Sequence, residues 1–556
     1  MGAKHVVSLV LNAHFPFVKE YIPLKKKDPQ AEDVPSCEPQ TDVQCMGLES
    51  AEESLFFEAI SETFLPLLEV LDRLEGDRVP FRLGLSVSPV LGQMLGDKLL
   101  MKKYAAHLDR QIDFGVRELE RPCGDGGRPQ LAKRYLDQAI DRRAAFTTRY
   151  DGNILGAFGH YSRKEKVEII AAPATHAFLP FLSPFPESVQ AQVEVGLSFF
   201  RYALGVSPRG FWLPGLGWSA DMDWFIKAYG FGFTIADSHG FVFGDPPPSR
   251  GSFFPVRTPQ GIVVLARDFN AVEDVKRMRG EGPYRDNGRD VGHDLPACDI
   301  EPFLARNGAR CHTGYKYWQQ PEGGTPSGEA NGVPYDPAKA RAAAEEHARR
   351  FLENCCGRLS EASGLMKEQP ISLCAFDADV FGRNWHEGPH FLENLFRFAA
   401  HYRNLQFMTP SEYISGLPTS ALEESTPEFS SWGENGYAET WLDSSNDWIY
   451  RHLGRASERM VELAERFSGD SWLRERALNQ AARELLLAQS SDWAALLRRQ
   501  ESAGFARHRV ESALRNFTRI YDAMGSNHIP TEWLTDLENQ RGVFQDINYR
   551  VFRRKR

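Results

Sequence analysis

Short apolar runs alternate with helical patterns along the first 413 residues of the chain. Near-continuous apolar runs are typical of strands buried on both faces, and strands that alternate with helices pair in parallel. Seven or eight such units predict an α/β fold, a closed (β/α)7 barrel. The runs are VVSLVLNAH (6–14), FRLGLSVSP (81–89), KVEIIAAPATH (166–176), RGFWLPGLG (209–217), FGFTIADSH (231–239), GIVVLARD (261–268), ISLCAFDAD (371–379) and LQFMTPSEY (405–413).

The apolar spacing changes at two places and divides the chain. Residues 91–163 show helical spacing between the second and third runs, which predicts a helical excursion from the barrel. Residues 25–51 are polar, contain proline and have no period, so we expect a loop there. From Asp447 onward apolar residues recur at three and four. We therefore expect a barrel over 1–416, a linker over 417–430 and a helical domain over 431–556.

Composition narrows the classes of partner. The 556 residues carry a formal net charge of −10, which argues against a nucleic-acid partner because phosphate binding requires a basic surface. No apolar segment approaches the roughly 20 residues that cross a bilayer, so we expect no membrane association. The first apolar run lacks a signal-peptide cleavage site, and Cys374 lies in an apolar run, as a reduced core thiol would. We expect a cytoplasmic protein.

Polar residues at the ends of the apolar runs are candidates for a site, because a barrel keeps its chemistry at the carboxyl ends of its strands. A carboxylate there can act as a general acid when apolar neighbours raise its pKa, although it can also be a helix cap or an ion-pair partner. The candidates are His14, His176, Asp237, His239, Arg267 and Asp377. A zinc site built from His14, His176, Asp237 and His239 is a weaker alternative, because no tight ligand spacing is present.

Two tryptophans, Trp432 and Trp441, lie in a Gly- and Ser-rich segment before the last helices. Exposed aromatic rings stack on the C–H faces of sugar rings, so both are candidate sugar platforms. The alternative is that they anchor the domain interface, the role we expect for Trp448.

These motifs together resemble glycoside hydrolase family 57, and specifically its α-1,4-glucan branching enzymes. The resemblance covers almost the whole chain. It is carried by NAHFPF, ETFLPLL, SPVL, ATHAFLP, DSHG, FDADVFGRNWHEGP, SSWGENGY, WIYRHL and RALNQAARELLLAQSSDW. It implies an α-glucan partner such as glycogen or a maltooligosaccharide, no cofactor and no metal. It also implies that Asp377 is the catalytic acid/base and that Trp212, Trp385 and Asp492 contact substrate.

This chain departs from the family pattern at the position of the catalytic nucleophile. The nucleophile motif of the family reads Trp-Leu-Pro-Glu, whereas this chain reads WLPG, so Gly215 stands where the nucleophilic Glu is expected. Asn12, Arg383 and Asn384 also depart from the pattern. Three hypotheses remain open: a glucan-binding protein with lost or reduced catalysis, an active enzyme that uses another carboxylate such as Asp221 or Asp223, and metal-dependent hydrolysis.

Overall fold

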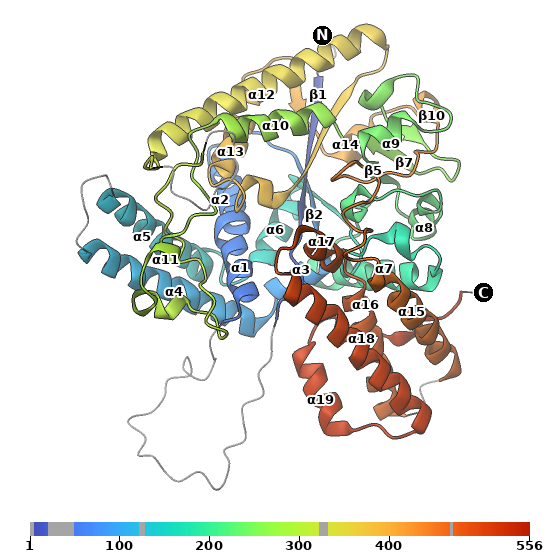
Figure 1. Ribbon diagram of the computed structural model, residues 1–556. Helices are drawn as coiled ribbons and strands as arrows, with labels where there is room; N and C mark the ends of the chain where they lie inside the picture. The colour runs from blue at the N-terminus through green and yellow to red at the C-terminus, as the bar shows by residue number, and fades with distance from the viewer. Residues whose placement is uncertain (1–4, 20–48, 122–127, 322–331, 468–470, 556) are drawn as a thin grey trace, which may run out of the picture.

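Seven parallel strands close into a barrel in the part of the chain that the computed structural model describes, which is residues 5–19, 49–121, 128–321, 332–467 and 471–555 (Figure 1). Direct pairing joins β1 to β2 and β8, β2 to β3, β4 to β5 and β5 to β7. Parallel bridges from Ala171 to Phe211 and from Arg267 to Leu373 close the two remaining gaps. The predicted (β/α)7 barrel is therefore confirmed. Its strands are β1 (His5–Ala13), β2 (Leu83–Val87), β3 (Val167–Ile170), β4 (Gly210–Phe211), β5 (Phe233–Ala236), β7 (Val263–Ala266) and β8 (Ile371–Asp377).

The eighth apolar run lies outside this ring. It forms β9 (Leu405–Phe407), which pairs in parallel with the beginning of β1. Two short strands, β6 (Val256–Arg257) and β10 (Glu423–Glu424), extend the sheet beside β7. Because β9 is formed by an apolar run of the same kind, the pattern of runs alone predicted either seven or eight barrel strands.

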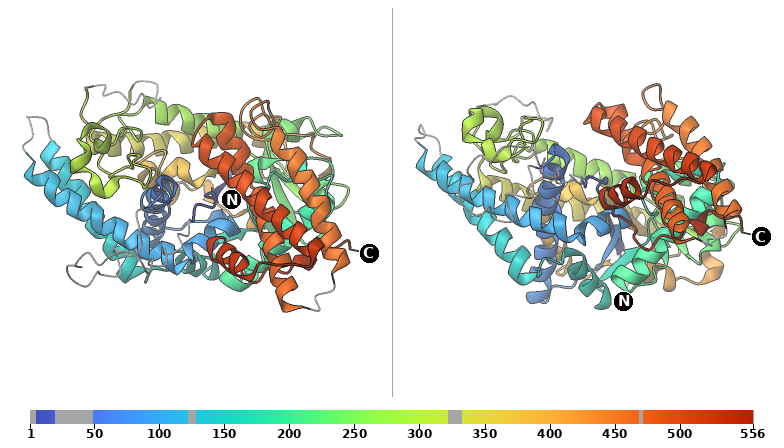
Figure 2. Two further views of the ribbon diagram at one scale, coloured as in Figure 1. Left: turned by 60° about the horizontal axis from the view of Figure 1, so that its bottom comes forward. Right: turned by 90° about the horizontal axis from the view of Figure 1, so that it is seen from below.

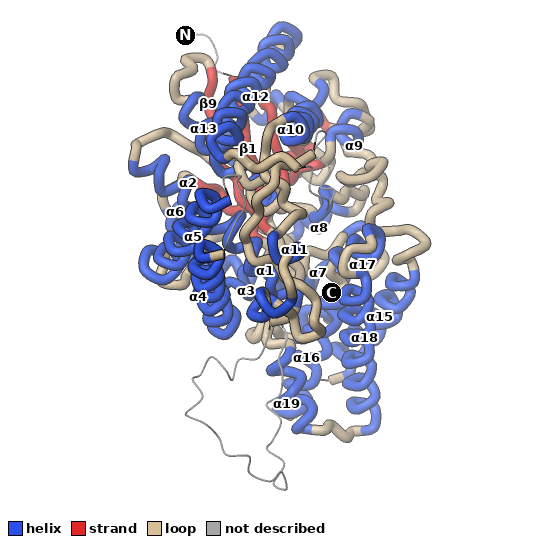
Figure 3. The backbone as a smooth tube through the Cα atoms, turned by 60° about the vertical axis from the view of Figure 1, so that its left-hand side comes forward, coloured by secondary structure: helices blue, strands red, loops and turns tan. Residues whose placement is uncertain are grey.

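Both faces of the strands are buried, as continuous apolar runs require. Val6 and Val10 point into the barrel, where they pack with Trp212 and Leu265. The alternate residues of β1 belong to a second, larger core between the strands and the helices. Side chains of a strand alternate between faces, so one run of apolar residues supplies both cores. Figure 3 shows the strands enclosed by the helices.

The outer helices follow the strands in sequence. They are α1 (Ala51–Ala59), the π-helix η2 (Ile60–Phe64), α2 (Leu65–Gly76), α7 (Pro186–Phe199), α8 (Met222–Ala228), α9 (Ser238–Val242), α10 (Phe269–Glu281), α11 (Val291–Asp294), α12 (Pro337–Leu365), α13 (Gly388–Ala399) and α14 (Pro410–Ser415). The expected excursion consists of α3 (Pro89–Leu95), α4 (Lys98–Glu120), α5 (Arg128–Ala144), the π-helix η3 (Ala145–Arg149) and α6 (Ile154–Arg163). The loop expected over 25–51 lies almost wholly outside the described residues.

Five helices form the C-terminal region and pack beside the barrel, on the side away from α4 and α5 (Figure 2). Thr175 Oγ1 donates to the Leu486 carbonyl over 2.6 Å, and Ser491 Oγ donates to the His176 carbonyl over 2.6 Å. Both contacts join the end of β3 to the helical region. No described helix combines the length and apolar character needed to span a bilayer. The five helices are α15 (Trp448–Arg466), α16 (Trp472–Ala488), α17 (Ser491–Arg499), α18 (Ala503–Ser526) and α19 (Thr531–Gln540).

Candidate functional site

A pocket of about 610 Å³ lies at the carboxyl ends of the strands, where the barrel meets α17 and α18. Barrel enzymes keep their sites at this end, because the strand ends bring polar residues from distant parts of the sequence together. Seven of the candidate site residues line the pocket: His14, His176, Gly215, Asp377, Trp432, Trp441 and Asp492. The three other positions that depart from the family pattern, Asn12, Arg383 and Asn384, line it as well.

Asp377 ends β8 and its side chain is open to the pocket. Asn12, at the end of β1, donates from Nδ2 to Asp377 Oδ1 over 2.8 Å, and the same Nδ2 lies 3.3 Å from His176 Nε2. The side chain is exposed in the pocket, but the pocket walls replace part of the bulk water around the carboxyl. This partial desolvation, with a smaller contribution from the negative charge of Asp379, raises the pKa of Asp377 to about 6 against the opposing Asn12 hydrogen bond. A carboxyl held protonated up to this pH can act as a general acid.

His14 and His176 form the floor of the pocket as a stacked pair. Their ring centroids lie 3.8 Å apart with an interplanar angle of 6°. His14 Nε2 donates to the Asp492 carboxylate over 2.9 Å, and its Nδ1 lies 2.7 Å from Ser88 Oγ. Burial, together with the charge of His14, holds the pKa of His176 well below its usual range. His176 is therefore neutral, and the pair is anchored through Asp492 to the helical region.

Gly215 lies in the left-handed backbone region with φ of +65°, directly beneath the ring of Trp441. A Cβ at this position would lie 2.6 Å from Trp441 Cζ2 and closer still to Cη2. Trp441 is buried and stacks on Phe178, with ring centroids 4.5 Å apart. The Trp441 ring thus occupies the space that a side chain at position 215 would need.

Trp432 is half-buried and lines the pocket beside Gly215, whose carbonyl accepts its backbone N–H over 2.7 Å. The Arg267 guanidinium lies 5.5 Å from the Trp432 ring centroid and donates to Asp237 over 2.5 Å. Trp212 meets the Trp432 ring edge-on at 5.4 Å. This network holds Trp432, the less buried of the two candidate sugar platforms.

His239 and Trp385 lie away from the pocket lining. His239 Nε2 donates to the Gly436 carbonyl over 2.8 Å, and its Nδ1 lies 3.5 Å from Asp237. Trp385 is buried against Tyr284 and Phe391. Within the described residues, no three His, Cys, Asp or Glu side chains gather as metal ligands.

The alternative carboxylates named from the sequence do not reach the pocket. Asp221 precedes α8 and Asp223 lies in its first turn, and neither lines the cavity. Asp379 does line it, but it is paired with Arg383 at 3.0 Å and accepts a hydrogen bond from Thr63 Oγ1 over 2.9 Å. Besides Asp492, eight lining residues come from α17, α18 and the turn between them, and sequence reasoning missed them. Only the adjacency of Ser491 to Asp492 could have indicated one of them. The eight are Ser491, Ala495, Leu496, Arg498, Arg499, Glu501, Ser502 and Phe505.

A closed parallel barrel with a carboxyl of raised pKa and an accessible aromatic ring at its mouth defines a site of the glycoside hydrolase class. Residues 14–276 match the model of glycosyl hydrolase family 57, and residues 452–552 match that of the 1,4-alpha-glucan branching enzyme C-terminal domain. The chain belongs to glycosyl hydrolase family 57.

Known relatives agree with this assignment. The chain is 27% identical over 520 residues to the 1,4-alpha-glucan branching enzyme TK1436 of Thermococcus kodakarensis, covering 89% of this chain and 74% of that protein. The crystal structure of the alpha-amylase AmyC from Thermotoga maritima is similar at 34% identity and a TM-score of 0.86, with all of both chains covered. A GH57-type branching enzyme from Pyrococcus horikoshii shares the fold at 24% identity and a TM-score of 0.83, covering all of this chain and 97% of that one.

Proposed function

We propose that the chain binds α-1,4-glucan in the barrel pocket and has lost, or strongly reduced, the catalysis of a retaining glycosidase. Retaining glycosidases need an acid/base carboxyl and a nucleophilic carboxylate on either side of the scissile bond. Asp377 supplies the first. At the second position Gly215 supplies no functional group, and loss of one member of such a unit typically costs several orders of magnitude in rate.

The observation that carries this proposal is the position of Trp441. Its ring covers Gly215 and stacks on Phe178, so the space of the absent nucleophile is filled by protein. A glucan would instead lie against the open ring of Trp432, with polar contacts to the His14 and His176 pair and to Asp377. The alternative is an active α-glucan enzyme that uses Asp377 with another base. The raised pKa of Asp377 favours this alternative.

Calorimetry with maltoheptaose tests the binding proposal. We expect measurable binding, and we expect Trp432→Ala to weaken it by about 1–2 kcal/mol because a stacking platform is lost. Trp472→Ala is the matched control, because that ring is 73% exposed on α16 and does not line the pocket. Absence of binding to maltooligosaccharide and to glycogen would overturn the proposal.

Activity assays on the same protein separate the two functions. We expect neither branching nor hydrolysis of α-glucan above background. Turnover at ordinary enzyme rates, about 1 per second or more, would favour the active alternative. The configuration of the released product would then show whether a distant base acts with inversion.

A further inference from the structure

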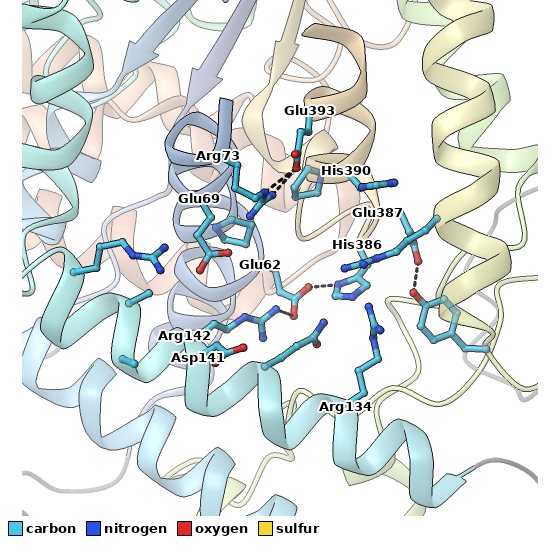
Figure 4. Close-up of a pocket in the computed structure, with 18 of the residues that line it drawn as sticks. Glu62, Glu69, Arg73, Arg134, Asp141, Arg142, His386, Glu387, His390 and Glu393 are labelled. Atoms are coloured by element: carbon cyan, nitrogen blue, oxygen red, sulfur yellow. Dashed lines mark hydrogen bonds and ion pairs between the residues drawn. The ribbon is translucent and has the colours of Figure 1, made fainter. Parts of the chain in front are cut away.

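A second cavity, the outer groove, lies on the outside of the barrel and is larger than the barrel pocket, at about 940 Å³. Its walls are η2, α2, α5, η3, the beginning of α12, and α13 with the two residues before it (Figure 4). None of its lining residues lines the barrel pocket. The outer groove is therefore separate from the proposed glucan site.

Part of the outer groove is lined by side chains that already pair with one another. Glu62 accepts from Arg142 over 3.1 Å and from His386 Nδ1 over 2.8 Å, and Arg73 pairs with Glu393 at 2.8 Å (Figure 4). Burial, together with the charge of Arg285, lowers the pKa of His386 to about 4, so this ring is neutral. Because its Nδ1–H donates to Glu62, its Nε2 remains a hydrogen-bond acceptor.

Three buried polar atoms of the outer groove have no hydrogen-bond partner among the described residues: Arg134 Nε, Gln138 Oε1 and Glu387 Oε2. Glu387 is only 3% exposed, and its other oxygen accepts from Tyr335 over 2.6 Å. In Figure 4 the Arg134 side chain extends from α5 toward His386 and Glu387. Buried polar groups are rarely left without partners, so these atoms indicate a polar ligand.

Two arginines of the outer groove lack a carboxylate partner. Neither Arg134 nor Arg341 forms an ion pair with a described residue, yet both line the same cavity. Burial and the positive charge of Arg134 lower the pKa of Arg341, which indicates that the two guanidinium groups repel one another. An oxyanion between them would remove this repulsion and accept charge-assisted hydrogen bonds from both.

We propose that the outer groove binds a hexose phosphate, with the phosphoryl group between Arg134 and Arg341 and the sugar hydroxyls on Gln138, His386 Nε2 and Glu387. The groove matches both halves of such a ligand, because two unpaired cations lie beside a set of hydrogen-bonding atoms. Among the described lining residues the only Trp, Phe or Tyr is Tyr335, which is buried with its hydroxyl bound to Glu387, so it offers no open ring for a nucleobase. This favours a sugar phosphate over a nucleotide.

Calorimetry on the full chain tests this proposal, with glucose 6-phosphate, glucose and inorganic phosphate as probes. We expect glucose 6-phosphate to bind at least tenfold more tightly than either fragment, because only it engages both sets of groups. Arg134→Met and Arg341→Met should each weaken that binding about tenfold or more. Arg515→Met, an exposed arginine on α18, should leave it unchanged.

Two further variants show whether a change in glucose 6-phosphate binding comes from the glucan site or from misfolding. Trp432→Ala should leave glucose 6-phosphate binding unchanged, since that ring lies in the other cavity. Arg134→Lys keeps the charge but loses the planar fork, so it should give an intermediate affinity in a folded protein. Equal binding of inorganic phosphate and glucose 6-phosphate would mean an adventitious ion only and would overturn the proposal. So would equal binding of glucose, or no binding at millimolar concentration.

Discussion

Gly215 and Trp441 share one space at the end of β4. The left-handed backbone of Gly215 is a conformation that L side chains rarely adopt, and the Trp441 ring covers the same position. Under the proposal that a nucleophile has been lost at this position, the Trp441 ring would have to move before a side chain could return. Sequence comparison identified the glycine, but the ring over it became visible only in the fold.

Restoring the carboxylate alone should fail. We expect Gly215→Glu to lower the free energy of unfolding by about 1–3 kcal/mol, because the new side chain overpacks a buried site and takes an unfavourable backbone conformation. It should restore no hydrolysis of maltoheptaose.

The double variant Gly215→Glu with Trp441→Ala is the matched comparison. It removes the overlapping ring, so we expect it to recover part of the stability lost by Gly215→Glu, as measured by urea denaturation. If Gly215→Glu alone were as stable as the unsubstituted chain, Trp441 would not be the obstacle that the geometry indicates.

Asp377 should make stability depend on pH in a defined direction. Its pKa is raised to about 6 in the folded chain, compared with about 3.9 in an unfolded one. Between these values the folded state binds more protons, so its free energy of unfolding decreases as pH rises from about 4 to about 6. We expect this decrease to be smaller in Asp377→Asn, which cannot ionise. Asp536→Asn, an exposed residue of α19, should behave as the unsubstituted chain does.

Among the structural elements, the π-helix η2 connects the two cavities. Glu62 lines the outer groove, while the next residue, Thr63, binds Asp379 at the barrel pocket. Thr63 Oγ1 also accepts the backbone N–H of Arg383 over 3.1 Å. Thr63 is buried, and its hydroxyl fixes the segment after β8 that carries the two pocket residues Asp379 and Arg383.

Thr63→Val should measure what that hydroxyl contributes. The substitution keeps the shape of the side chain but leaves the Asp379 carboxylate and the Arg383 N–H each one partner short. We expect the free energy of unfolding to fall by about 1–3 kcal/mol. Thr148→Val, an exposed threonine just after α5, should change it little. Equal effects of the two substitutions would show that the hydroxyl of Thr63 has no special role.

Over the whole molecule, local patterns predicted the barrel but not the packing between distant parts. Buried parallel strands produce continuous apolar runs, so the ring of strands and the polar residues at its mouth could be read from the sequence. β9 has the same kind of run but pairs only with the beginning of β1, and no local signal distinguishes it. Trp385 resembled a substrate contact through its motif, yet it is buried against Tyr284. The outer groove depends on helices far apart in the chain and had no sequence signal.

The ion pair between His14 and Asp492 links the barrel to the helical region, with side chains only 10% and 15% exposed. Burial alone would raise the pKa of Asp492, but the charge and hydrogen bond of His14 lower it below its ordinary value. A lowered carboxyl pKa contributes stability that is present above about pH 3.9 and is lost as pH falls through the folded-state pKa.

Asp492→Asn should therefore be less stable than the unsubstituted chain at pH 7, by about 1.5–3 kcal/mol, because the hydrogen bond from His14 to a charged carboxylate is lost across the interface. The difference should shrink as the pH falls below about 4, because the unfolded carboxyl takes up a proton there before the folded one does. Urea denaturation over a pH series measures both effects, with Asp522→Asn, exposed on α18, as the control. A difference that persisted unchanged at pH 3 would mean that the negative charge of Asp492 is not what stabilises this interface.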